Sequence, residues 1–301
     1  MVPRAEFQSY YGKPIIKAPT WKTPDVAMYL FLGGLAGASS AMGALAEVTG
    51  RQRLARASYI TSTLSATGGA GALIHDLGRP ERFLNMLRVL KPTSPLSIGS
   101  WALASYSTLS GVAAASTVTG LFPGVGRLAK VGAAVLSPVM MTYTAVVVAD
   151  TAVPAWHDAY RELPFVFAGS SLISGGGVAL LTTPPEEAGP ARMMALAGAG
   201  LELAAETRMT SRLGLVAEPY DTGRAGRWLR SAQALTAAGT LGALAGRRSR
   251  VVTALSGAAL LAGSLCTRFG IFEAGKASAT DPKYTVVPQR ERLEAGGQRA
   301  G

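Results

Sequence analysis

His75 and Asp76 are neighbouring ionisable residues at the end of a long apolar run, where they begin the segment HDLGRP. Reduction of a quinone takes up protons as well as electrons. A quinone site therefore needs an apolar slot, donors to the quinone oxygens and a titratable relay to water. Histidine and aspartate can supply the donor and the relay, and Tyr143 and Tyr29, inside apolar runs, can donate to the same oxygens. This pattern predicts a proton-handling quinone site.

The same segment also has a purely structural interpretation. Gly78 and Pro80 can stop the helix, while Arg79 can anchor at the lipid headgroups and pair with Asp76. Tyrosines inside apolar runs are commonly core or interfacial residues. Residue type and position alone leave both interpretations open.

Three further acidic residues, Asp150, Glu202 and Glu206, lie in or near apolar runs. Ionisable groups at membrane depth are costly and often functional. Glu202 and Glu206 share a helix face because they are four residues apart. All three are therefore candidates for a proton path. The alternative for Glu206 is a simple ion pair with Arg208 or Arg212.

The composition restricts the chemistry that the chain can carry by itself. Cys266 is the single cysteine, so neither a disulfide within the chain nor the set of thiolates that holds an iron–sulfur cluster is possible. His75 and His157 are the only histidines, too few for a dihaem cytochrome, and no metal site is expected. The net charge of +11 does not indicate nucleic-acid binding, because the basic residues cluster in short loops between apolar runs.

The elements that must position these residues are eight apolar runs of about 20 residues, each long enough to span a bilayer as a helix. The runs are Asp25–Glu47, Leu54–His75, Ile98–Leu121, Leu128–Val153, Phe165–Thr183, Pro190–Leu213, Gly226–Ala245 and Val251–Phe272. We expect an all-α, polytopic transmembrane bundle, arranged as two four-helix halves. A polar segment (1–24) precedes the quinone-binding domain (25–272), and an extended polar tail (273–301) follows it. Pro138 interrupts the fourth run, and Glu81–Leu90 is a short amphipathic piece in the second loop.

Loop charge predicts the orientation. With eight spans, the two termini and the loops after spans two, four and six share one side, which holds 20 of the 29 Lys and Arg residues, Arg268 among them. The positive-inside bias then places both termini in the cytoplasm of a cell (plasma or inner) membrane.

Three segments resemble one known family. They are HDLGRPERFLNMLRVLKPTSPLSIGSW (75–101), YLFLGGLAG (29–37), and the spacing from Pro138 through Tyr143 to Trp156, Leu163-Pro164 and the SGGG segment. This pattern, which covers nearly all the chain in order, resembles the NrfD/polysulfide reductase membrane-subunit family.

The resemblance implies an eight-helix bundle that binds menaquinone or another quinone as an exchangeable ligand and carries no haem, iron–sulfur cluster or metal. It also implies a docked, ferredoxin-like, four-cluster iron–sulfur subunit, with a molybdopterin catalytic subunit or a multihaem cytochrome beyond it. His75, Asp76 and Tyr143 match the family's quinone motif, and Tyr29 is an addition from position. Family members are known with the catalytic partner outside the membrane, whereas the charge count places the HDLGRP side inside.

The leading hypothesis is therefore a quinone-reactive membrane subunit of a multi-subunit oxidoreductase, whose substrate is converted on another subunit. The alternative is a proton or ion translocator that uses Asp150, Glu202 and Glu206. A third interpretation is a passive membrane anchor.

Overall fold

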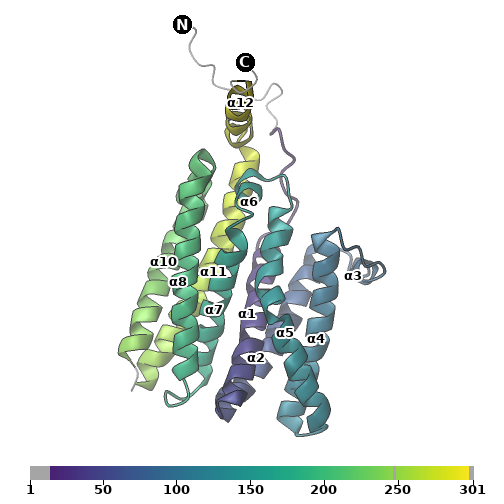
Figure 1. Ribbon diagram of the computed structural model, residues 1–301, viewed down its shortest axis with the longest axis vertical. Coiled ribbons are helices and arrows are strands. Elements are labelled where there is room, and N and C mark those ends of the chain that lie inside the picture. Colours follow the sequence, from purple (N-terminus) through teal and green to yellow (C-terminus); the bar gives the residue numbers. More distant parts are fainter. Residues whose placement is uncertain (1–13, 247–248, 298–301) are drawn as a thin grey trace.

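Long helices that run up and down dominate the computed structural model, which describes residues 14–246 and 249–297 (Figure 1). Eight of them have 20 or more residues: α1 (Asp25–Val48), α2 (Gln52–Asp76), α4 (Pro95–Thr119), α5 (Pro123–Ala149), α7 (Leu163–Thr182), α8 (Gly189–Leu213), α10 (Gly223–Ala245) and α11 (Arg250–Thr280). Short elements fill the connections: α3 (Arg82–Met86), α6 (Pro154–Asp158), the 3-10 turn η1 (Gly214–Ala217) and α9 (Glu218–Asp221). No strand occurs in the described ranges, so the expected all-α class is confirmed.

The long helices form two groups (Figure 1). One group contains α1, α2, α4 and α5, and the other contains α7, α8, α10 and α11. The groups meet where α7 packs against α1 and α5, and where α11 packs against α1. The connections 77–94, 150–162 and 214–222 therefore lie at one end of the bundle, together with α12 (Lys283–Gly297). We call it the upper end, after its place in Figure 1.

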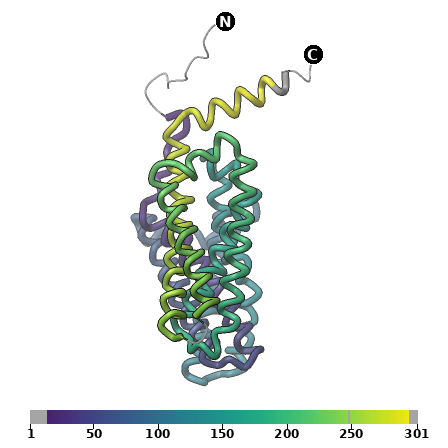
Figure 2. Tube along the Cα trace, turned by 90° about the vertical axis from the view of Figure 1, so that its left-hand side faces the viewer, coloured from purple at the N-terminus to yellow at the C-terminus, as the bar shows by residue number. Residues whose placement is uncertain are grey.

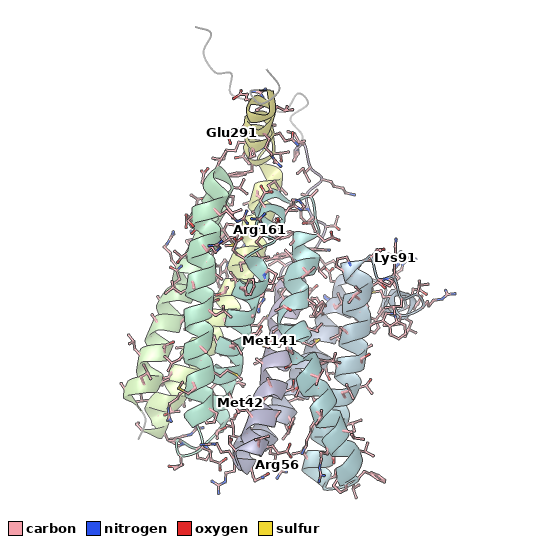
Figure 3. All side chains as sticks on the ribbon, in the orientation of Figure 1. Met42, Arg56, Lys91, Met141, Arg161 and Glu291 are labelled. Atoms are coloured by element: carbon pink, nitrogen blue, oxygen red, sulfur yellow. The ribbon has the colours of Figure 1, made fainter. Side chains whose placement is uncertain are left out.

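Apolar character and charge are distributed as a bilayer requires. Among the described residues, four helices, α1, α5, α7 and α11, are long and apolar enough to cross a membrane. In Figure 3, Arg161 and Lys91 lie towards the upper end and Arg56 near the lower end, with Met42 and Met141 between them. Charged residues at both ends of an apolar middle are typical of helices in a membrane.

Close approach at glycines holds the helices together. A side chain on Gly37 would place a Cβ 2.8 Å from the carbonyl oxygen of Ser137, so this glycine lets α1 lie against α5. A Cβ on Gly177 would lie 2.8 Å from the carbonyl oxygen of Gly257, where α7 meets α11. Small residues allow such packing where lipid removes the hydrophobic drive between helices.

Three expected boundaries are wrong by four residues or more. The fourth run begins at Pro123 rather than Leu128. The fourth run ends at Ala149 rather than Val153, which leaves Asp150 outside the helix as its C-cap. The last run continues to Thr280, because Gly275 allows the Trp156 ring to lie against the helix and Ser278 accepts a 3.2 Å hydrogen bond from the Ala155 backbone N–H. Hydropathy does not reveal such packing.

The C-terminal segment is helical where an extended tail was expected. Residues Lys283–Gly297 form α12, which turns away from the axis of α11 at the upper end (Figure 2). Pro138 lies inside α5 as expected, and the amphipathic piece in the second loop forms α3. The first 13 residues of the polar N-terminal segment lie outside the described residues, as do residues 298–301 of the tail.

Candidate functional site

Two tyrosines from different helices converge near the upper end. Tyr29 lies one turn into α1, and Tyr143 lies six residues before the end of α5. Their hydroxyl groups hydrogen-bond to each other, and the rings meet edge-on, with centroids 6.5 Å apart and an interplanar angle of 72°. Tyr143 is 7% exposed, and its ring lies directly against Gly99 of α4. Two phenol groups, each able to donate a hydrogen bond, are thus held between α1, α4 and α5.

The last turn of α2 is fastened beside this pair. Nδ1 of His75 lies 2.8 Å from Oδ2 of Asp25, in the first turn of α1. The His75 side chain is 76% exposed, whereas that of Asp25 is 15% exposed, so the pair reaches from water towards the interior. Asp25 and Tyr29 are four residues apart and therefore share one face of α1. His75, Asp25 and Tyr29 thus form a series that begins at a largely exposed side chain and ends at the partly buried tyrosine pair.

Asp76 has a different contact from the one expected. Its Oδ1 accepts a 2.9 Å hydrogen bond from the backbone N–H of Lys22, and no ion pair with Arg79 occurs in the described part of the chain. Asp76 thereby holds the segment that leads into α1. Gly78, whose φ of 70° is in the left-handed region that favours glycine, follows the end of α2 as the structural interpretation requires.

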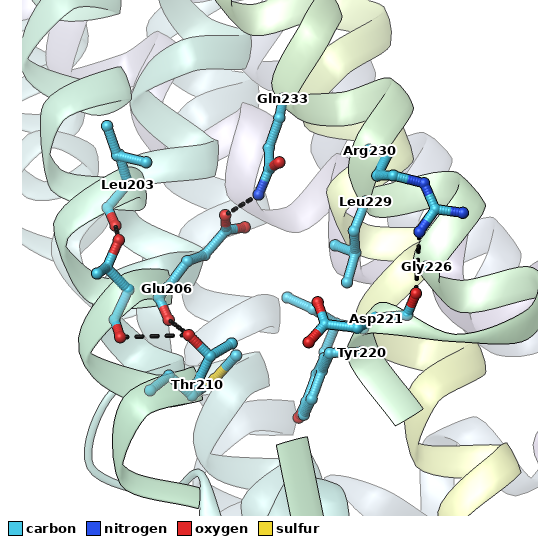
Figure 4. Close-up of a pocket in the computed structure, with 12 residues that line it drawn as sticks. Leu203, Glu206, Thr210, Tyr220, Asp221, Gly226, Leu229, Arg230 and Gln233 are labelled. Carbon is cyan, nitrogen blue, oxygen red and sulfur yellow. Dashed lines mark hydrogen bonds between the residues drawn. The ribbon is translucent and has the colours of Figure 1, made fainter. Parts of the chain in front are cut away.

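The acidic residues of the predicted proton path lie outside this site: Glu202 and Glu206 are one turn apart on α8, and Asp150 follows the end of α5. Glu202 is 5% exposed within α8, and the polar side chains around its carboxyl group include Ser170, Thr267 and Arg268. Glu206 is partly buried one turn further and accepts a 3.3 Å hydrogen bond from Nε2 of Gln233, on α10 (Figure 4). Asp150 is exposed at the end of α5, in the other half of the bundle.

The expected ion pair of Glu206 with Arg208 or Arg212 is wrong. Arg212 instead donates to both oxygens of Glu162, from Nε at 2.8 Å and from the terminal NH2 at 2.6 Å, and Nε of Arg208 lies 4.0 Å from Oε1. Glu162 is 4% exposed at the start of α7, outside the apolar runs. The hydrogen bonds from Arg212 lower the pKa of this carboxyl below its usual range.

Arg268 is buried in the bundle rather than exposed at its end. The side chain is 1% exposed within α11, and its guanidinium lies 3.8 Å from the centroid of the Phe167 ring. The terminal NH2 donates to the backbone oxygen of Phe167 at 2.7 Å and to Oγ of Ser171 at 2.9 Å. A buried arginine cannot count towards a loop-charge bias, so its place in the sequence-based orientation count was wrong.

Two contributors to these sites could not be identified by residue type alone. Asp25 begins an apolar run as helix-starting aspartates commonly do, and its only signal is the spacing to Tyr29. Arg268 stands near the end of the last apolar run, where arginines usually reach the lipid headgroups. Their roles depend on His75 and Glu202, which lie far away in the sequence.

An all-helical bundle with membrane-compatible helices, and with hydrogen-bonding and ionisable residues gathered at one end, defines a multi-pass membrane protein. The model of the family described as Polysulphide reductase, NrfD, matches residues 17–184, which is more than half of the chain. The chain therefore belongs to the NrfD family. No curated protein matches the chain.

Family membership carries a coarse functional assignment. It indicates a membrane subunit of a respiratory oxidoreductase, in which NrfD members partner with iron–sulfur and catalytic subunits. The match extends just beyond the end of α7 and includes Tyr29, His75, Asp76 and Tyr143. Helices α8, α10 and α11, which carry Glu202 and Arg268, lie beyond it.

Proposed function

We propose that this chain is the quinone-reactive membrane subunit of its complex, and that all eight long helices cross the bilayer. It would exchange electrons between a menaquinone-type quinone and a ferredoxin-like, four-cluster iron–sulfur subunit docked at the upper end. A molybdopterin subunit or a multihaem cytochrome would lie beyond that partner. The observation that carries the proposal is the Tyr29–Tyr143 pair, which lies one turn from the Asp25–His75 pair.

The residues present fit a quinone head. In the Tyr29–Tyr143 pair, one hydroxyl donates its hydrogen bond to the other. The accepting hydroxyl therefore still has its own proton to donate to a quinone oxygen. The quinone supplies the two-electron chemistry when it is bound. The chain's residues orient the ring and move protons.

The proton route follows from exposure. His75 is largely exposed and can exchange protons with water, and Asp25 connects it to the face of α1 that carries Tyr29. Asp76, which the sequence predicts as a relay, receives a positioning role instead, because it accepts from the Lys22 backbone and holds the start of α1.

The test is quinol-dependent reduction of the clusters in the assembled complex. We expect Tyr143→Phe and Tyr29→Phe each to slow it about 10- to 100-fold, because each loses a hydrogen bond to an oxygen that gains charge. His75→Gln should also slow it, because oxidation of the quinol releases protons that the exposed imidazole would carry to water. Asp76→Asn should stay within about three-fold of wild type, since an amide oxygen still accepts from Lys22.

The matched control is Tyr106→Phe. Tyr106 is a fully buried tyrosine of the same half, about two turns deeper in α4, where it bonds Ser62 and the backbone oxygen of Ala36. Wild-type rates in both upper tyrosine variants would refute the site. An equal loss of rate in Tyr106→Phe would show that the effect comes from altered packing and not from a quinone contact.

A second candidate function, proton or ion translocation, is favoured by the burial of Glu202 and Arg268 at 5% and 1% exposure. Glu206 would continue the proton path. Asp150 is exposed at the end of α5, in the other half of the bundle, and would only exchange protons at the surface. In vesicles, Glu202→Gln should abolish proton uptake and leave quinol oxidation intact if this function holds. Uptake at the wild-type rate would reject it.

A further inference from the structure

A groove opens between α8 and α10, in the half of the bundle beyond the residues matched to the family. It has a volume of about 640 Å³, which is within the range of small-molecule sites. Thr267 of α11 contributes to its lining, and Leu203 and Leu241, which are 61% and 66% exposed, lie at its edge. The groove therefore opens at the side of the bundle, towards lipid if the helices span the membrane.

Three buried polar atoms of residues that line this groove have no hydrogen-bond partner among the described residues: Oε1 of Glu202 and the hydroxyls of Thr236 and Thr240. Buried polar groups are nearly always paired, so a cluster of three exceptions in one groove requires an explanation. An absent ligand is one such explanation.

Other threonines of the chain show that the two hydroxyls are unusual. Helical threonines commonly donate to the carbonyl four residues earlier. Thr142 does so to Pro138 at 2.8 Å, and Thr207 to Leu203 at 2.7 Å. Thr236 and Thr240 do not, although both lie in the middle of a regular helix.

The arrangement of these atoms specifies the ligand. Thr236 and Thr240 are four residues apart, so their hydroxyls lie on one face of α10 about 6 Å apart along the axis. Glu202 lines the same groove from α8. A phospholipid headgroup belongs at the membrane surface, and an acyl chain would leave all three atoms unpaired. A flat, neutral ring with oxygens at opposite ends would pair them at mid-depth.

We propose that the groove between α8 and α10 is a second binding site for a quinone or quinol taken from the lipid. The choice of ligand rests on the proposed function; the need for an oxygen-bearing apolar ligand rests on the three unpaired atoms. The site holds its ligand without redox chemistry of its own. Residues of α8, α10 and α11 line it, whereas the tyrosine pair lies between α1, α4 and α5, so the two sites are separate.

A polar connection leads from the groove towards the upper end. Glu206 and Gln233 line the groove and also a smaller adjoining cavity, which Tyr220, Asp221 and Arg230 line as well (Figure 4). Figure 4 shows the hydrogen bond from Gln233 to Glu206 across the space between α8 and α10. Polar side chains thus line the way from a ligand bound at Glu202 to residues 214–222, which connect α8 to α10.

The experiment uses the assembled complex in lipid nanodiscs and a short-chain 1,4-naphthoquinone that carries a photoreactive azide. After illumination, labelled peptides are mapped by mass spectrometry. We expect labels on α8 and α10 as well as on α1 and α5. In the double variant Thr236→Val/Thr240→Val, labelling of α8 and α10 should fall about ten-fold, because Val keeps the shape of the side chain and removes the hydroxyl at both positions. Labelling of α1 and α5 should not change.

The matched control is Thr142→Val, which removes an exposed threonine hydroxyl from α5, outside the groove, and should leave labelling of α8 and α10 at the wild-type level. The inference is overturned if α8 and α10 are not labelled, if the double variant labels them as wild type does, or if added phospholipid displaces the label. Labels on α8 and α10 without labels on α1 and α5 would support this inference and reject the tyrosine site of the proposed function.

Discussion

Gly99→Ala tests the tyrosine site by moving a ring without removing a functional group. The new Cβ would lie 2.6 Å from Cε2 of Tyr143, whereas ordinary contact begins at 3.4 Å. The ring must therefore move by about 1 Å, or α4 must move away. Tyr143 is 7% exposed and bonded to Tyr29, so it has little room for the movement.

Two magnitudes follow. Overpacking of this size in a filled core costs about 1–3 kcal/mol of stability. A displacement of about 1 Å in a group that orients the reacting molecule costs on the order of 100-fold in rate. We therefore expect a folded protein whose melting temperature falls by a few degrees and whose quinol-dependent cluster reduction falls by about 10- to 100-fold.

The assay compares quinol-dependent reduction of the clusters with the melting temperature of the same complex. Gly111→Ala is the control, because it adds the same methyl group to the same helix at a position with nothing within 4 Å. It should retain the wild-type rate and stabilise α4 by about 0.5–1 kcal/mol. A Gly99→Ala complex that melts near wild type and oxidises quinol at the wild-type rate would refute the placement of Tyr143 at the reacting ring.

Three further predictions concern other contacts. The lowered pKa of Glu162 means that its pair with Arg212 contributes stability above the ordinary carboxyl pKa of about 4.3, and that this is lost as pH falls through the lowered value. Thermal melts at descending pH should show wild type losing stability relative to Glu162→Gln, and parallel curves would contradict the pairing. Arg268→Leu should destabilise the bundle by about 3 kcal/mol, because the Glu202 carboxyl loses a buried positive neighbour. Adding Glu202→Gln should recover part of that loss in thermal melts, and additive effects would show that the two are not coupled. Thr236→Val/Thr240→Val should melt at or above the wild-type temperature without added quinone, since neither hydroxyl has a partner to lose; a clear decrease would reveal contacts that the structure lacks.

Local pattern determined the helices and the end of the bundle at which the tyrosine site lies. Apolar runs of membrane length predict the eight long helices, and alternation of direction places Tyr29, His75 and Tyr143 at one end. The helices and their direction follow from the hydropathy of residues that are adjacent in the sequence, so they can be predicted without the structure. The C-terminal part of α11 is the exception, because Trp156, more than 100 residues earlier, packs against Gly275 there.

Tertiary structure alone decided the partners. Arg212 faces Glu162 rather than Glu206, Asp25 faces His75, and Arg268 lies inside the bundle although its position suggested a helix end. Each result depends on which helices pack together and on their rotation, and small residues in both surfaces determine that rotation. The groove with its unpaired hydroxyls follows from the same cause, because residues of α8, α10 and α11 line it together. The chain's sequence therefore determines its helices and the location of its tyrosine pair, while inter-helix packing determines which charges meet and which remain available to a ligand.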